Sequence, residues 1–174
     1  MKNIRTLVAV SLVAFGCLTA AHAQDTREQA ISKMRKVEPK EMDSTYHKSA
    51  PLAQKLVDDE LAKHPEVILM AIHAGAPKFD IIASNFGRIG KLGDEDDLRC
   101  IHTGKKNLEV DKTGTHYEVE FPLRDEAGRI IGAVGVVFNY KPGDDKKALE
   151  TIADEIAKDM SARTRNAAAL FGPA

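Results

Sequence analysis

Cysteine and long apolar stretches are both scarce in this 174-residue sequence. The apolar run from Leu7 to Leu18 is shorter than the roughly 20 residues that a helix needs to cross a bilayer, and no later run is longer. Cys17 lies inside that run, so the rest of the chain has only Cys100 and cannot form an intramolecular disulfide. These absences exclude a membrane-spanning protein and a disulfide scaffold, and stability must come from packing.

Residues 1–23 have the layout of a cleavable secretory signal. Lys2 and Arg5 precede the apolar run, which ends in the small residues of Ala21-His22-Ala23. We therefore predict cleavage after Ala23 and a periplasmic location for the mature chain. The alternative is a lipoprotein, because Cys17 follows Gly16 and is a possible lipidation site.

Neither sign of charge dominates the sequence. Removal of Lys2 and Arg5 with the signal lowers the basic residues from 25 to 23 against 26 acidic ones, which gives a formal charge of −3. The charges are interspersed along the chain. This mild acidity argues against nucleic acid or an anionic membrane surface as a partner.

The mature length, about 150 residues, is typical of one domain. We expect a polar leader over residues 24–48, a folded domain over 49–165 and a C-terminal tail over 166–174. Ser49 and Pro51 predict the start of an amphipathic helix that ends at His64-Pro65. Apolar residues at helical spacing predict a final helix after the Lys141–Asp144 turn.

Five strands are predicted between these two helices, at 67–74, 79–84, 107–111, 115–124 and 129–140. A charged, glycine-punctuated insert over residues 85–106 separates the second strand from the third. The expected fold class is α+β: a five-stranded antiparallel sheet with the N- and C-terminal helices on one face and the loop and helix insert on the other.

No catalytic, cofactor or metal site is predicted. Three of the six histidines, His73, His102 and His116, are candidate metal ligands, but they lack a ligand spacing such as His-Glu-x-x-His. Cys100 is read as a buried inert thiol. The acidic cluster Asp94–Asp97 lacks the alternating ligands of a calcium loop, and helix capping in a solvated charged turn explains it better.

Several short strings in order resemble a single Cache domain, a PAS-like extracellular sensor. They are Ile82-Ala83-Ser84-Asn85, Gly87-Arg88-Ile89-Gly90-Lys91, Asp94-Glu95-Asp96-Asp97-Leu98, Thr103-Gly104-Lys105, Tyr117-Glu118-Val119-Glu120, Ile131–Phe138 and Tyr140–Lys146. The likeness spans residues 64–162. It implies a ligand-sensing domain with a pocket between the sheet and the insert. Cache domains usually lie between membrane helices and feed a cytoplasmic output, which this sequence does not show. Three roles therefore stay open: delivery of a solute to a membrane-bound signalling or transport partner, service as an accessory subunit, or buffering of the ligand.

Candidate ligand contacts follow from this expected pocket. Arg88, Lys91 and Arg99 would supply cations, and Tyr117 and Tyr140 would supply aromatic walls. Arginine grips carboxylates through two parallel hydrogen bonds, so a small organic acid is the expected ligand. Two alternatives stay open. One is a structural or interaction module without a ligand, pairing as a homodimer through its N-terminal helix, and the other is a secreted enzyme with a dispersed site.

The predicted signal can be checked directly. The exported protein should begin at Gln24, as measured by N-terminal sequencing or intact mass of the periplasmic fraction. A mature chain that begins at Cys17 and carries lipid would contradict this and identify a lipoprotein.

Overall fold

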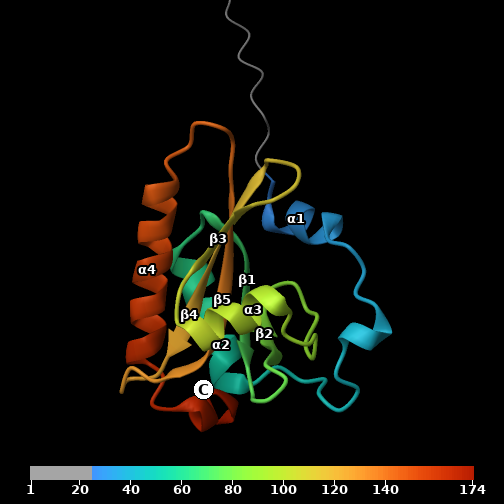
Figure 1. Cartoon of the computed structure of the whole chain (residues 1–174), viewed down its shortest axis with the longest axis vertical. Helices are drawn as coiled ribbons and strands as arrows, with labels where there is room; N and C mark the ends of the chain where they lie inside the picture. The colour runs from blue at the N-terminus through green and yellow to red at the C-terminus, as the bar shows by residue number, and fades with distance from the viewer. Residues whose placement is uncertain (1–24) are drawn as a thin grey trace, which may run out of the picture.

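The computed structural model describes residues 25–174 (Figure 1). The predicted signal sequence, its cleavage site and Cys17 lie outside the described residues. Among the residues that are described, no helix combines the length and the apolar character needed to cross a membrane.

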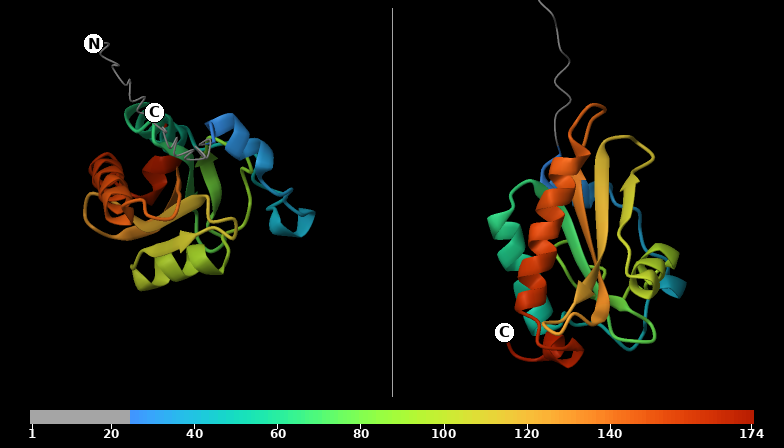
Figure 2. Two further views of the ribbon diagram at one scale, coloured as in Figure 1. Left: turned by 90° about the horizontal axis from the view of Figure 1, so that it is seen from above. Right: turned by 60° about the vertical axis from the view of Figure 1, so that its left-hand side comes forward.

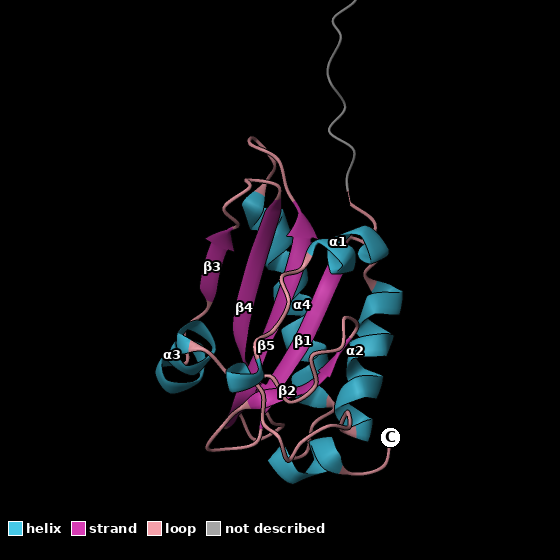
Figure 3. Ribbon diagram, turned by 90° about the vertical axis from the view of Figure 1, so that its right-hand side faces the viewer, coloured by secondary structure: helices cyan, strands magenta, loops and turns pink. Residues whose placement is uncertain are grey.

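The centre of the molecule is a five-stranded antiparallel sheet in the order β2-β1-β5-β4-β3. Figure 3 shows the strands fanned out in this order. Their bounds are β1 Val67–Ala74, β2 Asp80–Ser84, β3 Asn107–Val110, β4 His116–Arg124 and β5 Ile130–Asn139. All five agree with the predicted strands to within a residue at each end. This confirms the α+β class with an antiparallel sheet.

Helices cover both faces of the sheet. The two long helices, α2 (Pro51–Lys63) and α4 (Lys146–Ala162), lie on one face, and the short helix α3 (Glu95–Thr103) of the insert lies on the other (Figure 2). The predicted arrangement of helices is therefore confirmed. The start of α2 differs in detail, because Ala50 rather than Ser49 precedes the first turn and no side chain caps it.

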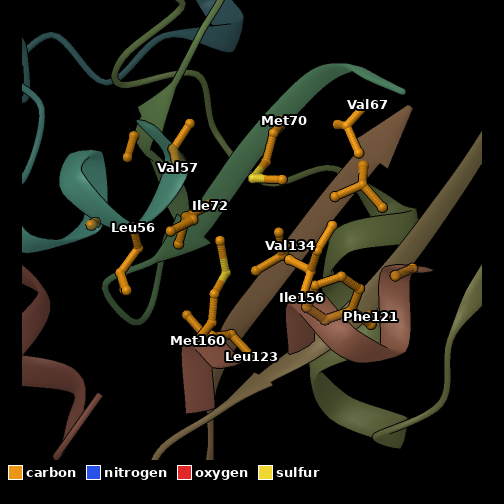
Figure 4. Packing of buried hydrophobic residues seen from close by; sticks show 14 of the residues in the cluster. Leu56, Val57, Val67, Met70, Ile72, Phe121, Leu123, Val134, Ile156 and Met160 are labelled. Atoms are coloured by element: carbon orange, nitrogen blue, oxygen red, sulfur yellow. The ribbon is translucent and has the colours of Figure 1, made fainter. Parts of the chain in front are cut away.

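The main core lies between the sheet and the two long helices (Figure 4). Strand side chains alternate between the two faces, so every second residue of β1, β4 and β5 points into this core. Met70 and Ile72 of β1 and Val134 and Val136 of β5 are fully buried there. Each Leu, Ile or Phe buried in this way contributes about 1.5–3 kcal/mol to folding.

The N-terminal segment packs along the edge and top of the sheet instead of hanging free (Figure 1). Helix α1 (Arg27–Lys33) lies against β1, and the Arg27 guanidinium donates to the carbonyl oxygens of Leu61, His64 and Val67 at 2.7–3.1 Å. The segment predicted as a polar leader, residues 24–48, thus packs as part of the folded domain from Asp25 onward. A short 3-10 helix, η1 (Pro39–Glu41), follows it.

Residues after η1 pair with the insert and fix its position. The Asp43 amide donates to the Gly90 carbonyl at 2.7 Å, and the Leu92 amide donates to the Glu41 carbonyl at 2.8 Å. Gly90 has a φ of +89°, and a Cβ there would lie 2.3 Å from the Tyr46 carbonyl oxygen. Only glycine therefore allows this close approach.

The C-terminal residues also belong to the folded unit, although the sequence suggested a tail over 166–174. They form a 3-10 helix, η2 (Ala167–Phe171), that packs against α2. Leu170 is fully buried in the main core. The short apolar stretch from Ala167 to Phe171 is too brief to show a period, so the burial of Leu170 is decided by tertiary contacts.

Replacing Leu170→Ala should therefore lower the free energy of unfolding by about 2–5 kcal/mol, because a buried leucine leaves a cavity. Leu108→Ala is the matched control, since Leu108 is 45% exposed, and it should cost less than about 0.5 kcal/mol. Urea melts of the two variants test this. Equal effects of the two substitutions would contradict the placement of η2 in the core.

Candidate functional site

A cavity of about 260 Å³ lies between the sheet and the insert, on the face away from α2 and α4. Its floor is formed by β1, β5 and β4, and its walls by α3, the loop before it and the N-terminal segment. The apolar part of its lining is Met34, Leu69, Ala71, Ile81, Phe86, Gly135 and Val137. The acidic part is Asp94, Asp96, Asp97, Glu109, Glu118 and Glu120. This is the location that the Cache resemblance implied for a pocket.

Strand β4 turns two glutamates toward the cavity. Tyr117 and Val119 are buried in the main core, so the residues between and after them, Glu118 and Glu120, face the insert. Gly135 of β5 lies directly opposite Glu120. A Cβ on Gly135 would lie 2.9 Å from Glu118 Oε1, so the missing side chain leaves room for that carboxylate.

Glu120 has an oxygen for which the described residues offer no donor. It is 3% exposed, and its Oε1 is buried without a hydrogen-bond partner in the described part of the chain. Burial, followed by the neighbouring Asp97 carboxylate, raises the pKa of Glu120 far above its ordinary range. A buried acceptor with no donor is costly, and so it indicates a group that ligand atoms can satisfy.

Asp97 reaches the cavity from the first turn of α3. Asp94 caps this helix by accepting hydrogen bonds from the Asp96 and Asp97 amides, and Asp97 Oδ2 accepts from the Asp94 amide at 2.8 Å. The predicted capping role of the acidic cluster is confirmed. The cluster is not wholly solvated, however, because Asp97 is buried. The reciprocal cap holds one carboxylate of the turn against the sheet.

His73 of β1 faces Asp97 across the cavity. Its Nε2 lies 3.4 Å from Asp97 Oδ1, and its Nδ1 lies 3.2 Å from the Phe79 carbonyl oxygen. Burial lowers the pKa of His73, so the ring is neutral at pH 7. A carbonyl can only accept, so Nδ1 carries the proton and Nε2 presents a lone pair toward Asp97.

The three predicted cations have different positions. Arg88 and Lys91 line the cavity, whereas Arg99 lies on α3 with its guanidinium paired with Asp96 and 3.0 Å from Asn107 Oδ1. Lys91 Nζ lies 3.1 Å from Asp94 Oδ2. The Arg88 guanidinium donates to the Arg35 carbonyl. Both cations in the cavity thus already have partners, and whether either binds a ligand stays a prediction.

The structure does not bring Tyr117 and Tyr140 together with these cations, so the expected aromatic walls need correction. Tyr117 is buried in the main core, where its hydroxyl donates to Glu150 Oε1 of α4 at 3.1 Å, and Tyr140 packs against that core with ring centroids 6.0 Å apart. The physical reason is the two-residue period of a strand, which places Tyr117 on the same face as Val119. That alternation could have pointed to Glu118 and Glu120 from sequence.

Other reactive groups lie outside the cavity. Cys100 is buried, and burial raises the pKa of its thiol to about 12, which agrees with the prediction of an inert thiol. No group of three or more His, Cys, Asp or Glu residues within 25–174 is arranged to hold a metal ion. Two larger hollows, of about 710 and 520 Å³, are shallower grooves beside the N-terminal segment.

Comparisons with known proteins support the fold. A protein from Burkholderia vietnamiensis described as a GAF sensor is 14% identical and superposes with a TM-score of 0.50 over 82% of this chain and 88% of its own. The nlh2 GAF domain of A. aeolicus is 17% identical, with a TM-score of 0.47 over 68% of this chain and 83% of that one. The five-stranded antiparallel sheet with its helices, and the superposition on the Burkholderia protein, show that the chain has a GAF-like fold, which is a PAS-like arrangement of sheet and helices.

One similar structure belongs to an enzyme. The type II free methionine-R-sulfoxide reductase from Thermoplasma acidophilum is 18% identical, with a TM-score of 0.47 over 62% of this chain and 86% of that chain. Other similar structures are described as GAF domains or transcriptional regulators. No family model and no curated protein sequence matches this chain.

The charge of Glu118 should make stability depend on pH. Glu118 is exposed as a residue, but its carboxyl group lies in the cavity, where loss of hydration, then the carboxylates of Asp97 and Glu109, raises its pKa to about 7 from 4.5. The folded state therefore holds this proton to higher pH than the unfolded state does. Protonation of Glu118 therefore contributes stability that is fully present below about pH 4.5 and is lost as the pH rises through about 7.

Glu118→Gln, which cannot ionise, should therefore gain stability relative to the parent protein between pH 4.5 and 8. The expected gain is about 1 kcal/mol, because solvent reaches this side chain through the open side of the cavity and screens its charge. Urea melts at the two pH values measure it, with Glu155→Gln on the exposed face of α4 as control. A difference between parent and variant that is the same at both pH values would contradict the raised pKa.

Proposed function

We propose that this chain is an exported small-molecule-binding protein whose ligand occupies the cavity between the sheet and α3. The observation that carries the proposal is the buried Glu120 Oε1, to which residues 25–174 offer no donor, in a cavity that also has apolar walls. Ligand pockets commonly join an apolar lining with a few polar groups that fix orientation. The volume of about 260 Å³ suits a compact ligand.

The GAF-like fold supports this proposal without naming a ligand. The Burkholderia protein of similar fold is described as a sensor, and the Cache resemblance of the sequence implies the same class of role. We therefore propose a sensor or accessory binding protein that acts with a membrane-bound signalling or transport partner. A non-catalytic role is proposed because neither Cys100 nor a histidine-based nucleophile pair faces the cavity among its lining residues.

Sequence alone favoured an organic acid as the ligand, and the cavity weakens that choice. Arg88 and Lys91 are present in the lining, yet each has a partner within the chain, and the same lining contains six carboxyl side chains. A carboxylate ligand would enter a negatively charged space, which costs energy at short range. The proposal is thus for a small molecule in this cavity, with an organic acid as one outcome of its test.

A thermal-shift screen tests the proposal with a panel of amines, amino acids, organic acids and sugars. A ligand at 100 times its Kd adds about 2.7 kcal/mol to the stability of the folded state, which raises the melting temperature by about 5–10 °C in a domain of this size. At least one compound of the panel should produce such a shift.

A variant with a larger side chain in the cavity is the control for the position of the site. Ala71 lies on the cavity floor and is flanked by Leu69 and His73 on the same face of β1. Ala71→Leu should remove the ligand-induced shift while the unliganded protein melts within a few degrees of the parent. A shift that persists in Ala71→Leu would place the ligand elsewhere, and a panel without any binder would contradict the proposed function.

A further inference from the structure

The acceptor atoms in the cavity outnumber the donors that the chain supplies to them. Glu120 Oε1 has no donor among the described residues. Asp97 accepts through Oδ2 from the Asp94 amide and directs Oδ1 at the unprotonated Nε2 of His73. Glu120, Asp97 and His73, from β4, α3 and β1, therefore face one cavity, where the raised pKa of Glu120 lets its carboxyl group hold a proton beside Asp97 until a donor from outside the chain replaces it.

The charges on the cavity floor are also unbalanced. Glu109 of β3 lies directly opposite Glu118 of β4, and Glu120 follows on the same face. Like charges directly across a strand pair are destabilising unless something neutralises them. The two cations in the lining already have partners within the chain, since Lys91 pairs with Asp94 and Arg88 binds a carbonyl of the N-terminal segment. The floor therefore favours a positive charge that comes from outside the chain.

We propose that the cavity binds a small organic cation, a primary amine with a compact apolar body, through Glu120, Asp97 and His73. A primary ammonium group has three donors and no acceptor, and so it matches three converging acceptors. Its charge neutralises the carboxylates of β4, and its apolar body lies against Leu69, Ala71 and Val137. This inference rests on the proposed function and adds the chemical class of the ligand.

The raised pKa values of Glu118 and Glu120 agree with such a site. In the empty cavity, protons on these carboxyl groups relieve the crowding of negative charge. A bound ammonium group would take over that role, and the carboxyl groups would release protons as it binds. A metal ion is the less favourable occupant, because the described acidic and histidine side chains are not arranged as a coordination shell.

Three probes of one shape but different charge test the inference. Isobutylamine, isobutanol and isobutyrate share a branched apolar body, and they are cationic, neutral and anionic at pH 7.5. Each is titrated into the purified protein and followed by amide chemical shifts of β1, β4 and α3. The amine should bind with a Kd at least about tenfold lower than the alcohol, because a charge-assisted hydrogen bond is the stronger one. The isobutyrate ion should bind most weakly.

Variants assign the effect to the proposed acceptors. Glu120→Gln keeps the shape and removes the charge, and it should weaken amine binding about tenfold or more while leaving isobutanol nearly unaffected. Glu118→Gln is the second variant if Glu120→Gln does not fold. Glu155→Gln changes the net charge equally on the opposite side of the molecule and should leave the affinity for the amine unchanged.

The outcomes separate the inference from the proposed function. Tighter binding of isobutanol or isobutyrate than of the amine, in the same cavity, would overturn the inference and leave the proposed function standing. Saturable binding of calcium or zinc that shifts these resonances and excludes the amine would also overturn it. If no probe of any charge and no member of the metabolite panel binds, the inference and the proposed function fail together.

Discussion

The two-faced central strand pair, β1 with β5, is the feature on which the rest of this structure depends. On one face, Met70, Ile72, Val134 and Val136 pack under the two long helices and supply much of the main core. On the other face, small residues such as Ala71 and Gly135 leave space beneath the insert. Because strand side chains alternate, burial of the apolar residues on the first face determines which side chains point into the cavity on the second.

In the adjoining strand β4, burial of one face likewise positions charged side chains on the other. Tyr117, Val119, Phe121 and Leu123 are buried in the core, and their burial holds Glu118 and Glu120 toward the cavity. A shift of one residue in register would expose the apolar set and bury the glutamates in the core, so the register is strongly specified. Packing energy on one side of the sheet thus keeps carboxylates in place on the other side.

Keeping those carboxylates in the folded protein has a cost. Glu120 loses its hydration, and its Oε1 gains no donor from the part of the chain that the structure describes. Glu109 and Glu118 face one another across a strand pair. Buried groups without donors and facing like charges reduce stability in a protein that is otherwise well packed. Such locally unfavourable interactions are characteristic of functional sites. The insert supports the site from above, because the reciprocal cap of Asp94 and Asp97 rigidifies the first turn of α3 and the loop at Gly90 is tied to the N-terminal segment.

The sequence by itself determined the five strands, the two long helices and the faces of the sheet that the helices cover. Strand alternation, helical spacing and the turns after Val110 and Arg124 are local signals, and they located all five strands and both long helices. The predicted ligand contacts Arg88 and Lys91 line the cavity between sheet and insert, and their binding of a ligand stays a prediction. The sequence prediction erred on Tyr117 because the alternation of β4 was not applied to that side chain.

Only the tertiary structure decided what the cavity contains. Asp97, Glu120 and His73 come from an insert helix, a late strand and an early strand, so no spacing in the sequence relates them. Leu170 joins the core for a similar reason, through contact with a helix more than a hundred residues earlier. Such contacts depend on the close packing of elements that are distant in the chain, whereas periodicity records only the environment along a single element.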